Sequence, residues 1–395
     1  MADPRLTWRL IAAVLPLATV VSHSFGRSTY PLLLPVIRDD ILASNTEAGI
    51  AGTAVFVAYL AGVILTTAMA LRLEPIVIMR AGLGLAVIGL AVLAVAKGLT
   101  TLILGLALVS VAGAGIWITA PVLITDGVPP RRRGLVIGLL SASIGMANAV
   151  IAGGAQLAWT RLGAPTMWRP VFGVEGAVSL AVLVAVLVAV RPAASARVSS
   201  TIRLDALRHL PSWFRLTAAY VCFGVIAAGF VSFLAATLED DAGLSRPAVA
   251  TVFAGMGLAS VAGAPLAGWL ADRLGRRVAL GAVMVAMAVG CLCVALVRGP
   301  LLIGAVVGFG GFWASYPTLT ATFVRDHLDS REFSAAFGVM TIAYGIAAVF
   351  PPLLVGLVAD AFGTFSGVYL VLTAIAVLGA LLLLGVEEPG LEPGL

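Results

Sequence analysis

Residues 268–277 read Gly268-Trp269-Leu270-Ala271-Asp272-Arg273-Leu274-Gly275-Arg276-Arg277 and lie between two long apolar segments. A carboxylate at the end of one helix can meet the positively polarised N-terminus of a neighbouring helix. Arginines beside it can pair with carboxylates or with lipid phosphates. This run is therefore typical of a short charged loop that joins two membrane helices.

A second, altered copy of this run occurs earlier in the chain, as Ala70-Leu71-Arg72-Leu73-Glu74-Pro75. Other residues also recur at a nearly constant offset: Asp39 with Asp240, Gly62 with Gly263, Arg72 with Arg273, and Trp117 with Trp313. The chain is thus built from two similar halves. In membrane carriers such halves can rock about their interface, and we expect the ligand site there.

The composition excludes a soluble globular protein. Hydrophobic residues make up 61% of the chain and charged residues only 11%, against about 25% charged in a soluble domain. The apolar residues form runs of about twenty, which is the length that crosses a bilayer as a helix. We see no alternating ten-residue strands of the kind that build a membrane β-barrel.

We predict an all-α integral membrane protein with twelve transmembrane helices in two six-helix halves. The spans are 9–36, 47–71, 76–96, 99–124, 134–158, 168–190, 213–238, 247–270, 278–297, 300–323, 333–358 and 364–385. The first span has no small-residue cleavage site, so we expect it to be a membrane helix and not a cleaved signal. The predicted domains are an N-terminal bundle (1–190), a cytoplasmic linker (191–211), and a C-terminal bundle (212–395).

The arginines indicate the orientation in the membrane. Most of them, including Arg131, Arg132, Arg133, Arg276 and Arg277, lie in loops on one side of the predicted spans. By the positive-inside rule, both termini face the cytoplasm, which predicts a multi-pass protein of the cytoplasmic (inner) membrane. The net charge of +5 is then a consequence of topology and does not indicate nucleic-acid binding.

The run at 268–277 resembles the signature loop of the major facilitator superfamily (MFS), and the resemblance extends to the whole chain through its twelve-span pattern. In that family the loop latches the cytoplasmic side shut. The resemblance implies gating roles for Asp272, Arg273, Arg276 and Arg277, with the start of span eleven, Asp329–Glu332, as acceptor. In the first half only Arg72 remains, because Leu71 stands at the aspartate position. The two halves should therefore contribute unequally to gating.

The first span also resembles that of YbfB/YjiJ-type facilitators, through Phe25-Gly26-Arg27 followed by Tyr30 and Leu33-Leu34-Pro35. Two features typical of proton-driven drug exporters in the superfamily are missing. Span four has no arginine, and span five has no Gly-Pro step. Both absences argue against a conventional drug/proton antiporter.

Charged residues at membrane depth are functional candidates because they are costly to bury. His23, Arg27 and Tyr30 lie at i, i+4 and i+7 in the first span, so we expect them to share one helix face. A guanidinium there suits a carboxylate, sulfonate or phosphate, which it can bind with two parallel hydrogen bonds. The alternative is that Arg27 extends toward the interface or pairs within the protein.

Glu175, in span six, is the clearest intramembrane carboxylate. Desolvation favours its neutral form, so Glu175 can carry a proton. A structural pairing with Arg27 or Arg169 is an equal alternative. His23 is a second proton-coupling candidate, although a lone membrane histidine is more often a hydrogen-bonded packing residue.

The remaining candidate ligand contacts come from polar and aromatic residues on the spans that line the expected cavity. Each alone could be a packing residue, and as a group they should include several contacts. They are Tyr59, Trp117, Asn148, Phe230, Trp313, Tyr316 and Tyr344.

These observations favour a secondary active transporter that works by alternating access. Its substrate would be a small amphipathic solute, most plausibly an organic anion, coupled to protons. The alternative is a proton-driven exporter of hydrophobic drug-like compounds. No catalytic set or nucleotide-binding loop is visible, so we predict no enzyme activity and no cofactor. We expect no metal, since Cys291-Leu292-Cys293 has no partner ligands nearby, no nucleic acid, and a monomer in the lipid bilayer.

Overall fold

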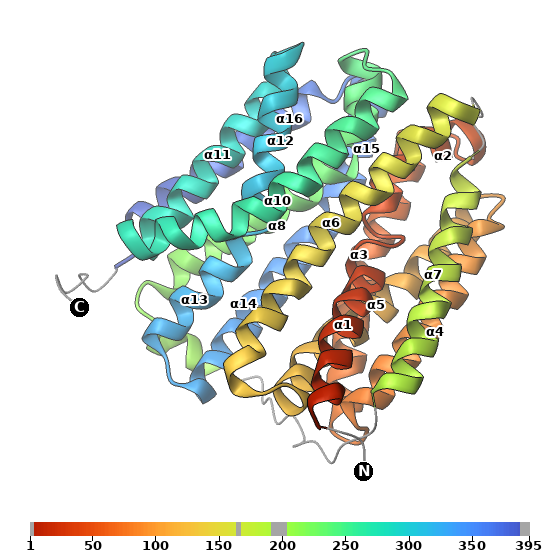
Figure 1. The fold of residues 1–395 in the computed structure, drawn as a ribbon. Coiled ribbons are helices and arrows are strands. Elements are labelled where there is room, and N and C mark those ends of the chain that lie inside the picture. Colours follow the sequence, from red (N-terminus) through yellow and green to blue (C-terminus); the bar gives the residue numbers. More distant parts are fainter. Residues whose placement is uncertain (1–3, 163–166, 191–203, 388–395) are drawn as a thin grey trace. The chain divides into compact units, whose positions relative to one another are not determined.

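A computed structural model of the chain describes residues 4–162, 167–190 and 204–387, and every regular element in this part is a helix (Figure 1). The chain divides into two compact units, the first formed by Met1–Ser199 with Leu244–Ala254 and the second by Ser200–Gly243 with Gly255–Leu395. The division falls inside the predicted linker, 191–211. Residues 191–203 lie outside the described residues, and Leu204–His209 forms a short 3-10 helix, η1.

The first unit contains the first six predicted spans. The first of these is in two pieces, whereas the next five are single helices. In chain order the helices are α1 (Pro4–His23), α2 (Thr29–Ile41), α3 (Asn45–Ala70), α4 (Pro75–Ala94), α5 (Leu99–Gly127), α6 (Pro130–Leu162) and α7 (Trp168–Ala189).

The second unit contains the other six spans, of which the seventh, tenth and eleventh are interrupted. The N-terminal turns of α10, up to Ala254, are grouped with the first unit. After η1 the elements are α8 (Trp213–Ser232), α9 (Leu234–Ala236), the π-helix η2 (Thr237–Asp241), α10 (Arg246–Leu274), α11 (Arg276–Leu296), α12 (Pro300–Trp313), α13 (Tyr316–His327), α14 (Ser330–Val349), α15 (Pro351–Phe362) and α16 (Ser366–Leu384).

Within the described residues, ten helices are long and apolar enough to cross a membrane, or eleven if the two arms of α10 count as one span. These arms, Arg246–Gly263 and Pro265–Leu274, are bent by 40°. The first predicted span does not qualify as a whole, because Trp8–His23 is a shorter apolar helix. Each of the twelve predicted spans nevertheless falls on a helix or an interrupted helix.

The interruption of the first span has two local causes. Gly26 has a φ of +70°, a left-handed conformation that few residues other than glycine adopt readily. Pro31 has no backbone N–H, and its ring would clash with the carbonyl of Arg27 in a continuous helix. Pro31 is tolerated in the first turn of α2, where backbone N–H groups have no intrahelical partner. The sequence predicts one continuous span over 9–36, and on this point the structure differs.

The paired acids that recur in the sequence have corresponding structural roles in the two units. At the end of α2, the Asp40 Oδ2 accepts hydrogen bonds from the Trp168 Nε1 (3.0 Å) and the Arg169 Nη1 (2.7 Å), where α7 begins. At the end of η2, the Asp241 Oδ2 accepts one from the backbone N–H of Phe365 (2.9 Å), just before α16. In each unit, an acid at the end of the first span therefore holds the start of the last span.

Glycines at matched positions allow the second and fourth spans of each unit to pack closely. A Cβ atom added to Gly62 on α3 would lie 2.8 Å from the Cα of Val111 on α5. A Cβ added to Gly263 on α10 would overlap the carbonyl oxygen of Gly311 on α12. In lipid, small residues allow helix backbones to approach each other in this way.

We expect Gly263→Ala to destabilise the protein by about 1–3 kcal/mol, the usual cost of overpacking a tight contact. The measurement is the thermal unfolding midpoint in detergent. Gly308→Ala is the matched control, because a Cβ at Gly308 on α12 meets nothing within 4 Å. Equal midpoints for the two variants would contradict the close packing of α10 on α12.

Candidate functional site

Four of the predicted ligand contacts come together in the first unit, beside the interruption of the first span. The His23 ring lies on Trp117 of α5, with ring centroids 4.3 Å apart, and 6.4 Å from the ring of Tyr59 on α3. The Arg27 guanidinium lies over the Tyr59 ring, with Cζ 4.3 Å from its centroid. We call His23, Arg27, Tyr59 and Trp117 the Arg27 cluster.

The Arg27 guanidinium is not neutralised by a protein carboxylate in any ion pair described for this chain. Its Nη1 is buried and has no hydrogen-bond partner among the described residues. Contact with the negative face of Tyr59 stabilises the cation only partly. The group is therefore available to bind an anion.

The interruption is stabilised by Glu175 of α7, which is only 3% exposed. Its Oε2 accepts a hydrogen bond from the backbone N–H of Gly26 (3.0 Å), and its Oε1 accepts one from the hydroxyl of Thr29. These partners differ from Arg27 and Arg169, the structural partners that we had considered. Glu175 thus bonds to the residues on both sides of Arg27.

Packing against α5 also restricts the interruption. A Cβ on Gly26 would lie 2.9 Å from the Val109 Cγ1, so a larger residue would displace the turn. The Ser22 hydroxyl donates a hydrogen bond to the carbonyl of Gly113 (2.7 Å) and shares another with the His23 Nδ1 (2.8 Å). Because Ser22 has one proton to donate, this pattern assigns the His23 Nδ1 as a donor.

Two other residues predicted in the first half, Tyr30 and Asn148, make no described contact with the Arg27 cluster. Tyr30 is buried, and its hydroxyl donates to the carbonyl of Ala48 (2.8 Å), so it holds α2 against α3. Asn148 lies on α6, one turn beyond Ile144, whose carbonyl accepts a hydrogen bond from Ser24 (3.3 Å). The Asn148 Oδ1 is buried without a hydrogen-bond partner among the described residues.

In the second unit, two predicted residues join an aromatic stack. The Tyr316 ring lies 4.7 Å from Phe223 and the Tyr344 ring lies 5.1 Å from Tyr220, all nearly parallel. Sequence reasoning missed Tyr220 and Phe223 of α8. Their i, i+3 spacing was the available signal, but it does not distinguish a stack from ordinary core packing.

The other two aromatic candidates of the second unit differ in burial. Phe230 is fully buried, stacks on Phe309 with centroids 3.6 Å apart, and accepts a hydrogen bond at its carbonyl from Tyr369. It is therefore part of the core of this unit. Trp313 is half-buried at the last residue of α12, where the tenth span is interrupted.

The charged loop forms a compact network within the second unit. Arg276 bridges Asp272 (2.7 Å) and Asp326 at the end of α13 (3.3 Å). Arg273 lies over the Trp269 ring, with its Cζ 4.4 Å from the ring centroid. The Arg277 Nη1 donates a hydrogen bond to the carbonyl of Val386 (3.2 Å).

The sequence predicts the acceptor of this loop at the start of span eleven, Asp329–Glu332, whereas Arg276 pairs with Asp326 at the end of α13. Part of the predicted capping box is present, because the Asp329 Oδ1 accepts from the backbone N–H of Glu332 (2.9 Å). Arg72, the remnant of the loop in the first half, is exposed between α3 and α4.

We expect Arg276→Gln to reduce the transport rate several-fold more than Arg72→Gln, since only Arg276 joins two carboxylates in the described contacts. Initial uptake rates in cells, normalised to the amount of protein in the membrane, measure this. Equal effects of the two substitutions would contradict unequal gating by the two halves.

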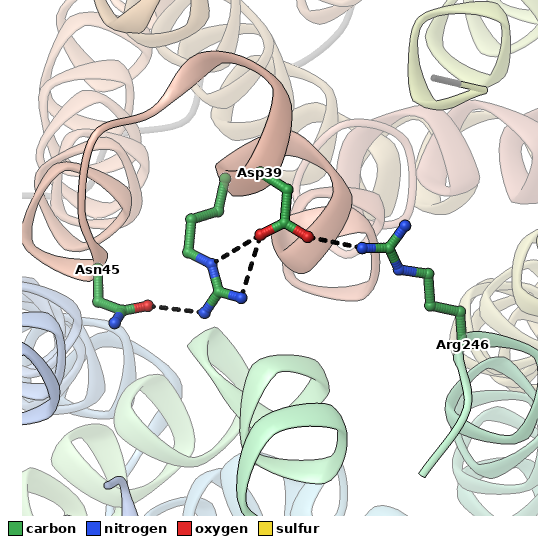
Figure 2. Close-up of polar contacts among 4 residues, drawn as sticks. Asp39, Asn45 and Arg246 are labelled. Carbon is green, nitrogen blue, oxygen red and sulfur yellow. Dashed lines mark hydrogen bonds and ion pairs between the residues drawn. The ribbon is translucent and has the colours of Figure 1, made fainter. Parts of the chain in front are cut away.

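A second polar network surrounds Asp39 at the end of α2 (Figure 2). Its carboxylate accepts hydrogen bonds from Arg38 (3.2 Å) and from Arg246 at the start of α10 (2.6 Å). Arg38 also donates to the Asn45 Oδ1 (3.0 Å). All of these residues belong to the first unit as the chain divides, and Asp39 is exposed.

The described residues contain no group of three or more His, Cys, Asp or Glu side chains placed to hold a metal ion. Helical spans and a charged loop of this kind define a multi-pass membrane transporter. Residues 19–384 match the family described as "Uncharacterised MFS-type transporter YbfB", and the chain belongs to this family of the major facilitator superfamily. It is a family of secondary transporters and not of enzymes.

Two relatives come from Bacillus subtilis (strain 168). The hexuronate transporter is 22% identical over 402 residues, covering 94% of this chain and 93% of the relative. The uncharacterised MFS-type transporter YwfA is 28% identical over 318 residues, covering 76% and 74%.

Solved structures confirm the predicted fold class. A bacterial homologue of the human lysosomal transporter Spinster, in an inward-facing and unoccupied conformation, matches with a TM-score of 0.72 and 16% identity, over 96% of this chain and 95% of that one. The nucleoside transporter NupG matches with a TM-score of 0.75 and 12% identity, over 95% and 99%. At these identities the matches show the fold alone.

Proposed function

We propose that this transporter moves a small amphipathic organic anion, and that the Arg27 cluster binds the anionic group. The observation that carries this proposal is the buried Nη1 of Arg27, which has no hydrogen-bond partner among the described residues. A cation at membrane depth without a protein counter-ion costs several kcal/mol. A carboxylate ligand would offset that cost with two parallel, charge-assisted hydrogen bonds.

The rings around Arg27 suit the rest of such a solute. Trp117 and Tyr59 present flat aromatic faces, and His23 offers a polar edge between them. An anion with an apolar or ring-shaped body could therefore bind with its charge on Arg27 and its body against these rings. One relative is a transporter of hexuronate, which is itself an organic anion.

Proton coupling is part of the proposal. Glu175 and His23 are the titratable side chains that lie at, or next to, the interrupted span and can exchange a proton during transport. Symport with a proton would allow an anion to accumulate against the inside-negative membrane potential, since the proton cancels the charge of the anion. Alternating access of the site is the expected mode of transport.

A second candidate function is proton-driven export of hydrophobic compounds. The observation in its favour is the stack of Tyr220, Phe223, Tyr316 and Tyr344 in the second unit, an uncharged aromatic cluster in which Tyr344 is half-buried and the other three rings are buried. Drug resistance on overexpression, with no response to organic anions, would favour this function over anion transport.

Arg27→Gln should weaken anion binding by about tenfold to a hundredfold, because the neutral amide can keep one hydrogen bond to the anion but loses the charge and the second bond. The anion affinity of Arg27→Lys should lie between those of the wild type and Arg27→Gln, because lysine keeps the charge but cannot form two parallel hydrogen bonds. Binding of glucuronate and benzoate to purified protein measures this. Arg161→Gln, at an exposed site near the end of α6, is the control. Unchanged affinity in Arg27→Gln would refute the anion assignment.

We further expect an inner-membrane monomer. The arginines in the first turn of α6 indicate that both termini lie in the cytoplasm. A cysteine introduced at Lys97, between α4 and α5, should react with an impermeant maleimide added outside intact cells. A cysteine at Arg132, exposed at the start of α6, should react only after the membrane is opened. The reverse labelling pattern would show that both termini lie outside the cytoplasm.

A further inference from the structure

An interrupted helix inside a membrane must satisfy its own backbone, because the hydrocarbon core holds no water to do so. Four of the five N–H groups in the interruption, residues 24–28, bond locally. Those of Ser24 and Phe25 bond to the carbonyl of Val20, and those of Arg27 and Ser28 bond to the carbonyls of Phe25 and Ser24. The N–H of Gly26 instead donates to the Glu175 Oε2 (3.0 Å). One side chain of another helix therefore completes the turn that carries Arg27.

The second bond to Glu175 can reverse its direction. The Thr29 hydroxyl donates to the Glu175 Oε1 and lies 3.3 Å from the carbonyl of Ser24. It has one hydrogen and two acceptors. When Glu175 is ionised, Thr29 donates to it. When Glu175 is protonated, its carboxyl O–H donates to the Thr29 oxygen, and the Thr29 hydrogen turns to Ser24.

We propose that Glu175 is a positioning residue which, by exchanging a proton, switches the hydrogen bonds of residues 24–29 and thereby sets the affinity of Arg27 for the anion. Glu175 touches Gly26 and Thr29, on either side of Arg27, and no described contact joins it to Arg27 itself. The proton and the anion thus use different residues that are linked by one turn of backbone. This inference rests on the proposed function.

Charge balance gives the direction of the coupling. Ionised Glu175 and Arg27 together have no net charge, so a bound monovalent anion would leave a net negative charge at membrane depth. A proton on Glu175 restores neutrality, which is the favoured state in a site that excludes water. Anion binding therefore favours the protonated form of Glu175, and the affinity of the protein for the anion should rise as the pH falls.

Other charged groups near Glu175 are few among the described residues. From the first span these are Arg27 and His23. On α7 itself, Arg169 is paired with Asp40 and lies six residues away, about 9 Å along the helix. On α4, Arg80 donates to the carbonyl of Val190 at the far end of α7. His23 is therefore the competing site for the coupled proton.

The test measures glucuronate and benzoate binding to the purified full-length protein from pH 5 to pH 8, together with proton uptake on binding. In the wild type, affinity should increase by up to about tenfold for each unit of pH decrease, which is the limit for one linked proton. Glu175→Gln resembles the protonated form, since its amide can donate to Thr29 and accept from Gly26. This variant should bind tightly at every pH and take up no proton.

Three further variants separate positioning from stability. Thr29→Val removes the hydroxyl, so it should weaken anion binding and make the affinity less dependent on pH. Thr29→Ser keeps the hydroxyl and should retain the wild-type affinity and pH dependence. Ser179→Ala is the matched control, because the Ser179 hydroxyl donates to the backbone carbonyl of Glu175 (2.8 Å), one turn away along α7, and has no described bond to residues 24–29. It should lower the unfolding midpoint at most and leave the pH profile as in the wild type.

Several outcomes would overturn the inference. A wild-type pH profile in Glu175→Gln, or loss of that profile in His23→Gln with Glu175 intact, would exclude Glu175 as the switch. If the anion still binds through Arg27 in those experiments, the proposed function survives. Binding of neither anion to the wild type, or binding unaffected by Arg27→Gln, would overturn both the proposed function and this inference.

Discussion

The hydrogen bonds of the buried Glu175 carboxylate are the interaction on which the arrangement of the first unit's site depends. The first span bends at Gly26, and without Glu175 the turn would leave an N–H group with no partner inside the membrane. The same carboxylate holds Thr29, the first residue of α2. Arg27 lies between these two attachment points, and its guanidinium reaches Tyr59 from there.

The two units share their helix packing but differ in chemistry. In both, a small residue brings the second and fourth spans together, and an acid at the end of the first span anchors the last one. Arg27, for which the described residues provide no ion pair, lies in the first unit, whereas the second has stacked aromatic rings and the charged network around Arg276. Duplication thus preserved the contacts that stabilise each bundle, while the polar residues diverged.

Part of the candidate site could be anticipated from residue type. Arg27 and His23 stand out because a cation or an imidazole is rare in an apolar span, and aromatic residues on other spans were plausible partners. The prediction that His23, Arg27 and Tyr30 share one helix face was wrong for Tyr30. The turn at Gly26 separates Tyr30 from His23, and the Tyr30 hydroxyl bonds to the carbonyl of Ala48. Phe230 proved to be core, because aromatic residues in a ligand site and in a packed interior have the same sequence pattern.

The sequence by itself determined the class of protein, the spans and the duplication, because the length and polarity of an apolar run are local properties. It also located the charged loop, whose residues are neighbours in the chain. Only the tertiary structure decided what Glu175 and Arg27 do. The hydrogen bond from Gly26 to Glu175 joins residues 149 positions apart, and Arg27 meets Tyr59 only through the packing of α3. Such contacts depend on how separate helices pack, which no local pattern encodes.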